Sequence, residues 1–340
     1  MNISILTEYG KDIGIGHLSR CVSLWQAFKT LKAKARMLVL RDKSKNSMSV
    51  PFRHEIISLN THPNAVLEAA QNSDIMIIDS YTIHKEIYAQ ISKIVTIAAY
   101  LDDYNRMRYP QGIVINGSAY GGRLAYPAPQ KNNYLLGPRF VFLRREFWEK
   151  CQRRLHKELR TVLITFGGSD QYNLTIRIIE LFNKYYPSLR KKVILGPLTE
   201  NVSAVKKICK KGDVVLCNPS ALQIRNSMLG SDIAISAGGQ TLYELARTGT
   251  PTIAIGVSDN QRLNLQWLKH YGFLEFAGWH NDKNLEQRIV FLIKKLNSLA
   301  LRKKKADSGK QLIDGQGALR VATHLIQLFK NRDHHDYTGN

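Results

Sequence analysis

The sequence has no run of eighteen apolar residues, so it predicts no helix long enough to cross a membrane. The first residues, MNISILTEYGKD, include acids and lead into a strand pattern, unlike a secretory signal. Cysteines are few and form neither a CxxC pair nor a disulfide framework; they are Cys21, Cys151, Cys209 and Cys217. We therefore expect a reduced, cytoplasmic protein.

Acidic residues are scarce: 27 Asp and Glu stand against 49 Lys and Arg, which gives a formal net charge of +22. Such an excess favours anionic partners. The basic residues are scattered, with local clusters at 206–211 and 302–305, and no basic run is interleaved with aromatics. We expect no specific nucleic-acid binding. The basic residues are interpreted as lying mainly on the solvated surface, where they attract anionic ligands or acidic membranes weakly.

Short apolar runs alternate with helical patterns along the 340 residues, which is typical of βαβ units with parallel strands. The predicted strands are 3–6, 37–40, 75–78, 97–101, 161–166, 192–195, 214–216, 233–236 and 252–255. Helical spacing begins at Leu18 and recurs over 174–185, 241–247 and 317–330. The fold class is therefore α/β, with two Rossmann-like, doubly wound domains facing a cleft. Ligands of such sheets bind beyond the carboxyl ends of the strands.

The charged stretch 144–160 is interpreted as the linker between the two domains. The predicted N-terminal domain covers residues 1–150, and the predicted C-terminal domain covers residues 151–330. The last helix is expected to pack back on the N-terminal domain, and residues 331–340 to form a disordered tail.

The first motif, GIGHLSR, lies between the first predicted strand and the first helix. Its glycines let the backbone approach a ligand, and the ordinary pKa of a histidine suits proton transfer. One alternative is a plain turn in which His17 caps the helix. The other is a dinucleotide-binding fingerprint, in which Ser19 occupies the position of the third glycine and Asp42 binds the ribose. The candidate residues here are Gly14, Gly16, His17 and Arg20.

Two glycine-rich turns follow strands of the second domain: FGGSD at 166–170 and AGGQT at 237–241. The backbone N–H groups of such a turn and of the helix behind it suit a diphosphate. Glu244 lies one turn into that helix, where its carboxylate could accept both hydroxyls of a ribose; otherwise it is a solvated helix residue. The candidates are Gly168, Gly238, Gly239, Gln240, Thr241 and Glu244.

Polar side chains also follow other predicted strands. Asn260 and Gln261 offer donors and acceptors for sugar hydroxyls, or serve as helix N-caps. Ile78 to Tyr81 and the pair Asp102 and Asp103 occupy strand ends of the first domain, and successive strand residues point to opposite sides. No further metal ligands accompany the two acids at suitable spacing, so we expect no catalytic metal and no cofactor.

Together the segments GIGIGHLSRC, IIDSY, LDDYNR, LLGPRFVFLRREF, TFGGSD, ISAGGQTLYELARTGTP, DNQ and IDGQGALR resemble the nucleotide-sugar hydrolases of pseudaminic-acid biosynthesis. That family removes UDP from UDP-2,4-diacetamido-2,4,6-trideoxy-β-L-altropyranose, and a spore coat polysaccharide biosynthesis protein is one of its branches. Its fold is related to the glycosyltransferase-B fold of the enzyme that makes lipid II. The resemblance covers about residues 3–328. The segment around 110–135 departs from the family pattern, so the resemblance does not specify the amino sugar.

The resemblance implies a metal-independent hydrolysis at the anomeric carbon, with His17 positioning or deprotonating water and Tyr81 near the sugar. It implies that residues 238–241 hold the diphosphate, that Glu244 holds the ribose, and that Asn260 and Gln261 contact the sugar or phosphates. Two alternatives stay open: a glycosyltransferase using the same donor with a sugar or lipid acceptor, and a non-catalytic polyanion-binding protein. The sequence leaves the oligomeric state open.

Overall fold

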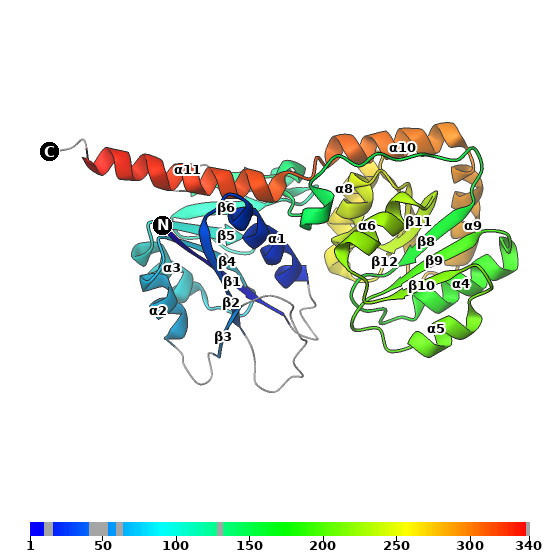
Figure 1. Cartoon of the computed structure of the whole chain (residues 1–340), viewed down its shortest axis with the longest axis horizontal. Helices are drawn as coiled ribbons and strands as arrows, with labels where there is room; N and C mark the ends of the chain where they lie inside the picture. The colour runs from blue at the N-terminus through cyan, green and yellow to red at the C-terminus, as the bar shows by residue number, and fades with distance from the viewer. Residues whose placement is uncertain (10–15, 41–53, 59–63, 128–131, 338–340) are drawn as a thin grey trace. The chain divides into compact units, whose positions relative to one another are not determined.

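The computed structural model describes residues 1–9, 16–40, 54–58, 64–127 and 132–337. The chain divides into two compact units, one of residues 1–145 and 316–340 and one of residues 146–315 (Figure 1). The chain therefore returns to the first unit after Gly315, whereas the sequence assigns residues up to 330 to the second domain. The predicted cleft between the domains stays a prediction.

The first unit is built on a parallel sheet with the strand order β3-β2-β1-β4-β5-β6-β7. Every residue of β4 and β5 is buried, which explains their uninterrupted apolar runs. The strands are β1 (Asn2–Glu8), β2 (Lys34–Leu40), β3 (Glu55–Ile57), β4 (Ile75–Asp79), β5 (Ile97–Leu101), β6 (Gly112–Asn116) and β7 (Asn132–Leu136).

Helices cover this sheet, and alternate residues of its strands face them. Leu6, Leu38 and Ile78 pack with Val66 and Tyr88 from the helices α2 and α3 in one apolar cluster. The last helix packs against α1 and continues to Tyr337, where the sequence predicts a disordered tail from residue 331. The helices are α1 (Gly16–Thr30), α2 (Ala65–Gln71), α3 (Lys85–Ile94) and α11 (Gly317–Tyr337), with short η1 (Gly121–Arg123) and η2 (Pro138–Phe140).

The second unit has a parallel sheet of order β10-β9-β8-β11-β12-β13, the strand order of a dinucleotide-binding fold. Its strands are β8 (Thr161–Thr165), β9 (Arg190–Leu195), β10 (Val214–Cys217), β11 (Ile233–Ala237), β12 (Thr252–Gly256) and β13 (Leu274–Trp279). Its helices are α4 (Leu174–Tyr185), α5 (Val202–Ile208), α6 (Ala221–Leu229), α7 (Thr241–Arg247), α8 (Arg262–His270), α9 (Leu285–Leu296) and α10 (Leu299–Leu312), with η4 (Asp259–Gln261); η3 (Arg145–Phe147) lies at the boundary of the units.

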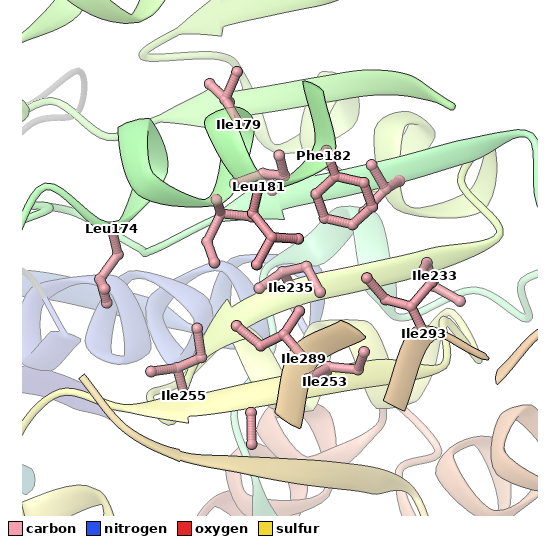
Figure 2. Close-up of a cluster of buried hydrophobic side chains, with 14 of the residues drawn as sticks. Leu174, Ile179, Leu181, Phe182, Ile233, Ile235, Ile253, Ile255, Ile289 and Ile293 are labelled. Atoms are coloured by element: carbon pink, nitrogen blue, oxygen red, sulfur yellow. The ribbon is translucent and has the colours of Figure 1, made fainter. Parts of the chain in front are cut away.

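Figure 2 shows how the second unit buries its strands. Ile233 and Ile235 of β11 and their neighbours on β12 face Phe182 of α4 and Ile289 of α9. Because alternate strand residues point to one face, Ile233 and Ile235 lie on the same side of the sheet. The predicted α/β class with two parallel sheets is therefore confirmed.

Part of the basic excess lies inside the second unit, although the sequence favours a solvated surface for it. Arg302 is fully buried and donates from Nη2 to the carbonyl of Lys157 at 2.8 Å. Lys305, 5% exposed, lies 2.9 Å from a carboxylate oxygen of Glu275. The cluster at 302–305 is therefore not simply solvated, because two of its four side chains are internal.

Asp232 is a buried carboxylate near Arg302 in the same unit. It is 2% exposed and accepts the backbone N–H of Arg160 at 2.8 Å and of Thr161 at 2.9 Å. His156 Nδ1 lies 2.8 Å from it, and Arg302 Nη1 lies 4.0 Å away. Burial alone would raise the pKa of Asp232, but these hydrogen bonds outweigh burial and lower it. The end of the predicted linker is thereby fixed to the second unit.

We predict that Asp232→Ala lowers the free energy of unfolding by about 3–5 kcal/mol, because it leaves the buried Arg302 guanidinium without its carboxylate and the N–H groups of Arg160 and Thr161 without their acceptor. Urea unfolding at pH 7 measures the change. Asp259→Ala is the control, since its ion pair with Arg262 is exposed and such pairs contribute about 0–1 kcal/mol. Equal losses in the two variants would contradict the role given to Asp232.

Candidate functional site

His17 lies in the first turn of α1, against the carboxyl end of β4. Its Nδ1 lies 2.6 Å from Oδ1 of Asp79, the last residue of that strand. The carboxylate of Asp79 is fully buried and the histidine is 8% exposed. Gly16, directly before it, has open space where a Cβ would stand. Gly14 and Asp42, which the sequence also singles out, lie outside the described residues.

Arg20 follows His17 by three positions, so the two side chains share one face of α1. Its guanidinium joins two carboxylates. Nε and Nη2 donate to Asp79 at 2.6 and 2.5 Å, and Nη1 donates to Asp103 at 2.6 Å. Sequence reasoning expects Arg20 to contact the substrate; the structure gives its guanidinium carboxylate partners on two strand ends, and the substrate contact stays a prediction.

Neighbouring charges and hydrogen bonds determine the ionisation states of Asp79 and Asp103. Burial alone would raise the pKa of Asp79, but the charge and hydrogen bonds of Arg20, with those of His17, hold it well below its usual range. The pKa of Asp103 is also lowered, since Arg20 outweighs burial there. Both carboxylates are therefore anionic at neutral pH and act only as hydrogen-bond acceptors.

The ionised Asp79 also determines which nitrogen of His17 carries the proton. A carboxylate can only accept, so the 2.6 Å contact requires a proton on Nδ1 of the ring. In the neutral imidazole the lone pair is then on Nε2. Such a histidine can take a proton from water, and the carboxylate behind it stabilises the imidazolium that forms.

Tyr81 places an aromatic ring beside this base. The rings of His17 and Tyr81 meet edge to face with centroids 4.5 Å apart. The tyrosine hydroxyl donates to Asp103, and the guanidinium of Arg106 lies 4.4 Å from the ring centroid. The ring is still 41% exposed. Burial and the charge of Asp103 raise the pKa of Tyr81, so its hydroxyl keeps its proton at neutral pH.

The adjacent acids after β5 serve different partners, as the alternation of side chains allows. Asp103 binds Arg20 and Tyr81, whereas Asp102 accepts the hydroxyls of Tyr109 and Tyr126 at 2.9 and 2.5 Å. Within the described ranges, no three His, Cys, Asp or Glu side chains gather in a way that could hold a metal ion.

In the second unit, Gly238 and Gln261 connect the two predicted polar motifs. The Gln261 Oε1 atom accepts the N–H of Gly238 at 3.0 Å and that of Val257 at 3.1 Å. Asn264 donates to the carbonyl of Gly238 at 2.7 Å. A Cβ on Gly238 would lie 2.8 Å from Gln261 Oε1, so glycine is needed for this close approach. The amide oxygen of Gln261 is thus used within the protein.

The other predicted residues of this unit lie at the carboxyl edge of its sheet. Gly239 follows Gly238, and open space surrounds the position of a Cβ there. Gln240 directly precedes α7 and Thr241 is its first residue. Glu244 of that helix is 5% exposed, and Asn260 is exposed in η4. Gly168 follows β8, and the carboxylate of Asp170 caps α4 by accepting the N–H groups of Leu174 and Thr175.

Sequence reasoning names His17 and Tyr81 but misses the partners that fix them, Asp79 and Asp103. Both acids stand at strand ends adjacent to motif residues, and the i, i+3 spacing of His17 and Arg20 is the available signal. One helix face that presents a histidine and an arginine toward strand-end acids indicates such a network.

Solved structures confirm the fold. The chain matches MurG of Acinetobacter baumannii with a TM-score of 0.63 at 13% identity, covering 96% of this chain and 99% of that one. It matches CalG4, the calicheamicin glycosyltransferase, with a TM-score of 0.61 at 10% identity, covering 97% and 98%. The chain therefore shares with these structures the α/β fold of two Rossmann-like domains that the resemblance implies.

Sequence relatives confirm the resemblance. The pseudaminic acid cytidylyltransferase and UDP-2,4-diacetamido-2,4,6-trideoxy-beta-L-altropyranose hydrolase of Helicobacter pylori is 26% identical over 326 residues, 94% of this chain and 55% of that protein. The spore coat polysaccharide biosynthesis protein SpsG of Bacillus subtilis is 24% identical over 345 residues, 97% and 99% of the two chains.

An uncharacterized protein of Methanocaldococcus jannaschii, MJ1062, is 26% identical over 279 residues, 77% of this chain and 57% of that protein. The chain thus spans little more than half the length of the archaeal and Helicobacter relatives. No family model matches the sequence.

The lowered pKa of Asp79 predicts how the stability of the protein depends on pH. A carboxylate with a folded pKa below its unfolded value of about 3.8 stabilises the fold above that pH, and this stabilisation is lost as the pH falls. Asp79→Asn should cost about 3–5 kcal/mol at pH 7 and progressively less below pH 4. Urea unfolding of both proteins from pH 7 to pH 3 measures the difference, and a difference that stays constant would contradict the ionised Asp79.

Proposed function

We propose that the protein hydrolyses a UDP-linked amino sugar at its anomeric carbon and releases UDP and the free sugar. The observation that carries this proposal is the hydrogen bond from His17 Nδ1 to the buried, ionised Asp79. It leaves Nε2 as a base at the carboxyl edge of a sheet, where ligands of doubly wound folds bind. The name of the Helicobacter relative supplies the substrate class, and the name of the Bacillus relative supplies the link to spore-coat polysaccharide; a role in surface polysaccharide is part of the proposal.

In the proposed reaction, a water molecule attacks the anomeric carbon while His17 Nε2 accepts its proton. The bond between that carbon and the bridging oxygen breaks, and UDP leaves with the oxygen. Asp79 stabilises the imidazolium that forms, and Arg20 keeps Asp79 ionised. The proposed step uses His17, Asp79 and Arg20 and includes no metal ion.

In the proposed complex, the second unit binds the nucleotide. Its glycine turn of Gly238 and Gly239, with Gln240 and Thr241, would hold the diphosphate, because backbone N–H groups stabilise the charge of a leaving phosphate. Glu244 would bind the ribose. Gly168, Asn260 and the amide NH2 of Gln261 would complete the contacts to the phosphates and the sugar, and Gly14 and Gly16 would let the first unit's backbone approach the sugar.

A glycosyltransferase is the second candidate, favoured by the glycosyltransferase name of the matched CalG4 structure. Such an enzyme would leave the donor intact until a sugar or lipid acceptor is present. A polyanion-binding protein without activity is the third. The burial of Arg302 and Lys305 reduces the surface charge on which that reading depends. Among the described residues, no helix combines the length and hydropathy needed to cross a membrane; the cytoplasmic location stays a prediction.

We predict that the wild-type protein releases UDP and free sugar from UDP-2,4-diacetamido-2,4,6-trideoxy-β-L-altropyranose without acceptor or added metal. His17→Gln should lower kcat by about 10²- to 10⁴-fold, as for loss of a general base. Nuclear magnetic resonance of the reaction mixture measures both products. A donor that binds but stays intact would favour the transferase, and a variant as active as the wild type would remove His17 from the mechanism.

The placement of the diphosphate predicts the effect of Gly239→Ala. A Cβ there meets no atom of the protein within 4 Å, so thermal stability should not change. The methyl group would instead occupy space that the proposal gives to the ligand, and the affinity for UDP should fall at least about tenfold, or 1.4 kcal/mol. Calorimetric titration with UDP, beside thermal unfolding, tests this. Unchanged affinity would place the diphosphate elsewhere.

A further inference from the structure

Glu8, the last residue of β1, is a buried carboxylate that the proposed mechanism does not use. It is 2% exposed and accepts three hydrogen bonds from the loop that follows the neighbouring strand β4. Ser80 Oγ donates at 2.5 Å, the backbone N–H of Tyr81 at 2.6 Å, and Thr82 Oγ1 at 2.6 Å. Every residue from 80 to 82 is therefore bonded to this one side chain.

The hydroxyl of Ser80 connects the carboxylate of Glu8 to the backbone of the loop. Its oxygen accepts the N–H groups of Thr82 at 3.1 Å and Ile83 at 3.2 Å. Both lone pairs of the hydroxyl are then used, so its proton must go to an acceptor, and Glu8 is that acceptor. The loop therefore folds around the Glu8 side chain at the end of β1.

The residue held in this way is Tyr81. Its backbone is bonded to Glu8, its hydroxyl donates to Asp103, and its ring contacts His17 edge to face at 4.5 Å. A ring that is 41% exposed would ordinarily sample several positions, yet this one is fixed at both ends. A fixed, open aromatic surface beside a base is suited to orienting a sugar ring for attack.

We propose that Glu8 is a positioning residue, which holds Tyr81 in place so that the tyrosine orients the sugar against His17. This inference rests on the proposed function and extends it to a residue that contacts neither the base nor the substrate. Glu8 acts through the loop 80–82, and its effect on turnover therefore depends on the presence of the Tyr81 side chain.

Glu8→Gln tests the inference with almost no change in volume. An amide has one oxygen and one NH2 group, so the NH2 end of the substituted side chain would meet N–H or O–H donors that need an acceptor. The variant thus disturbs the hydrogen bonds to the loop without opening a cavity. The same substitution at Glu55, an exposed residue of β3 in the same unit, is the matched control.

The experiment is a double-mutant cycle of Glu8→Gln and Tyr81→Ala, with kcat/KM for the UDP-linked sugar as the readout. In the wild-type background Glu8→Gln should lower kcat/KM by about 10- to 100-fold, as misplacement of an orienting group does. In the Tyr81→Ala background it should change kcat/KM by less than about twofold. The same fold-loss in both backgrounds would overturn the proposal, because Glu8 would then act without Tyr81.

A second readout separates this inference from the proposed function. Hydrogen exchange of the Tyr81 amide, followed by nuclear magnetic resonance without substrate, should be at least about tenfold faster in Glu8→Gln than in the wild type or Glu55→Gln. If the wild type does not turn over the sugar nucleotide, the proposed function fails while this result still decides whether Glu8 holds Tyr81. Unchanged exchange of that amide would overturn the positioning role.

Discussion

The ion pair between Asp79 and Arg20 is the interaction on which the candidate site depends. A fully buried carboxylate at a strand end would be costly without a cation, and Arg20 supplies two hydrogen bonds to it. Once ionised, Asp79 fixes the proton of His17 on Nδ1, and the remaining arm of Arg20 binds Asp103. Asp103 in turn accepts the hydroxyl of Tyr81. One buried charge thereby organises residues from α1, β4 and the end of β5.

Most of the fold follows from the sequence because parallel strands buried on both faces leave a clear pattern. The runs at Ile75–Ile78 and Ile97–Leu101 are continuous in the sequence and become the fully buried strands β4 and β5. The sequence pattern does not predict the strands β3, β6, β7 and β13. In β13 the buried Glu275 and Gly278, whose φ is +122°, interrupt the apolar run of the strand. The structure tolerates both residues because lysines pair with the acid and a β-bulge accommodates the glycine.

The candidate site could be predicted in part. His17 and Tyr81 stand in motifs that name a base and a sugar contact, whereas Asp79 and Asp103 appear in the sequence as strand-end acids of no stated role. Their shared partner, Arg20, comes from α1 and precedes Asp79 by 59 residues in the chain. Local patterns do not report such long-range ion pairs. The same reason applies to Arg302 and Asp232, since a lysine- and arginine-rich helix resembles a solvated one until its tertiary partners are known.

One chemical claim is central to the proposed function: water attacks the anomeric carbon of a nucleotide sugar with His17 as the base. Hydrolysis in water enriched in oxygen-18, followed by mass spectrometry of both products, tests it most directly. We expect the heavy oxygen in the hydroxyl of the released sugar and not in UDP. Label in the phosphate of UDP would mean attack at phosphorus, and it would contradict the geometry of the reaction proposed for this site.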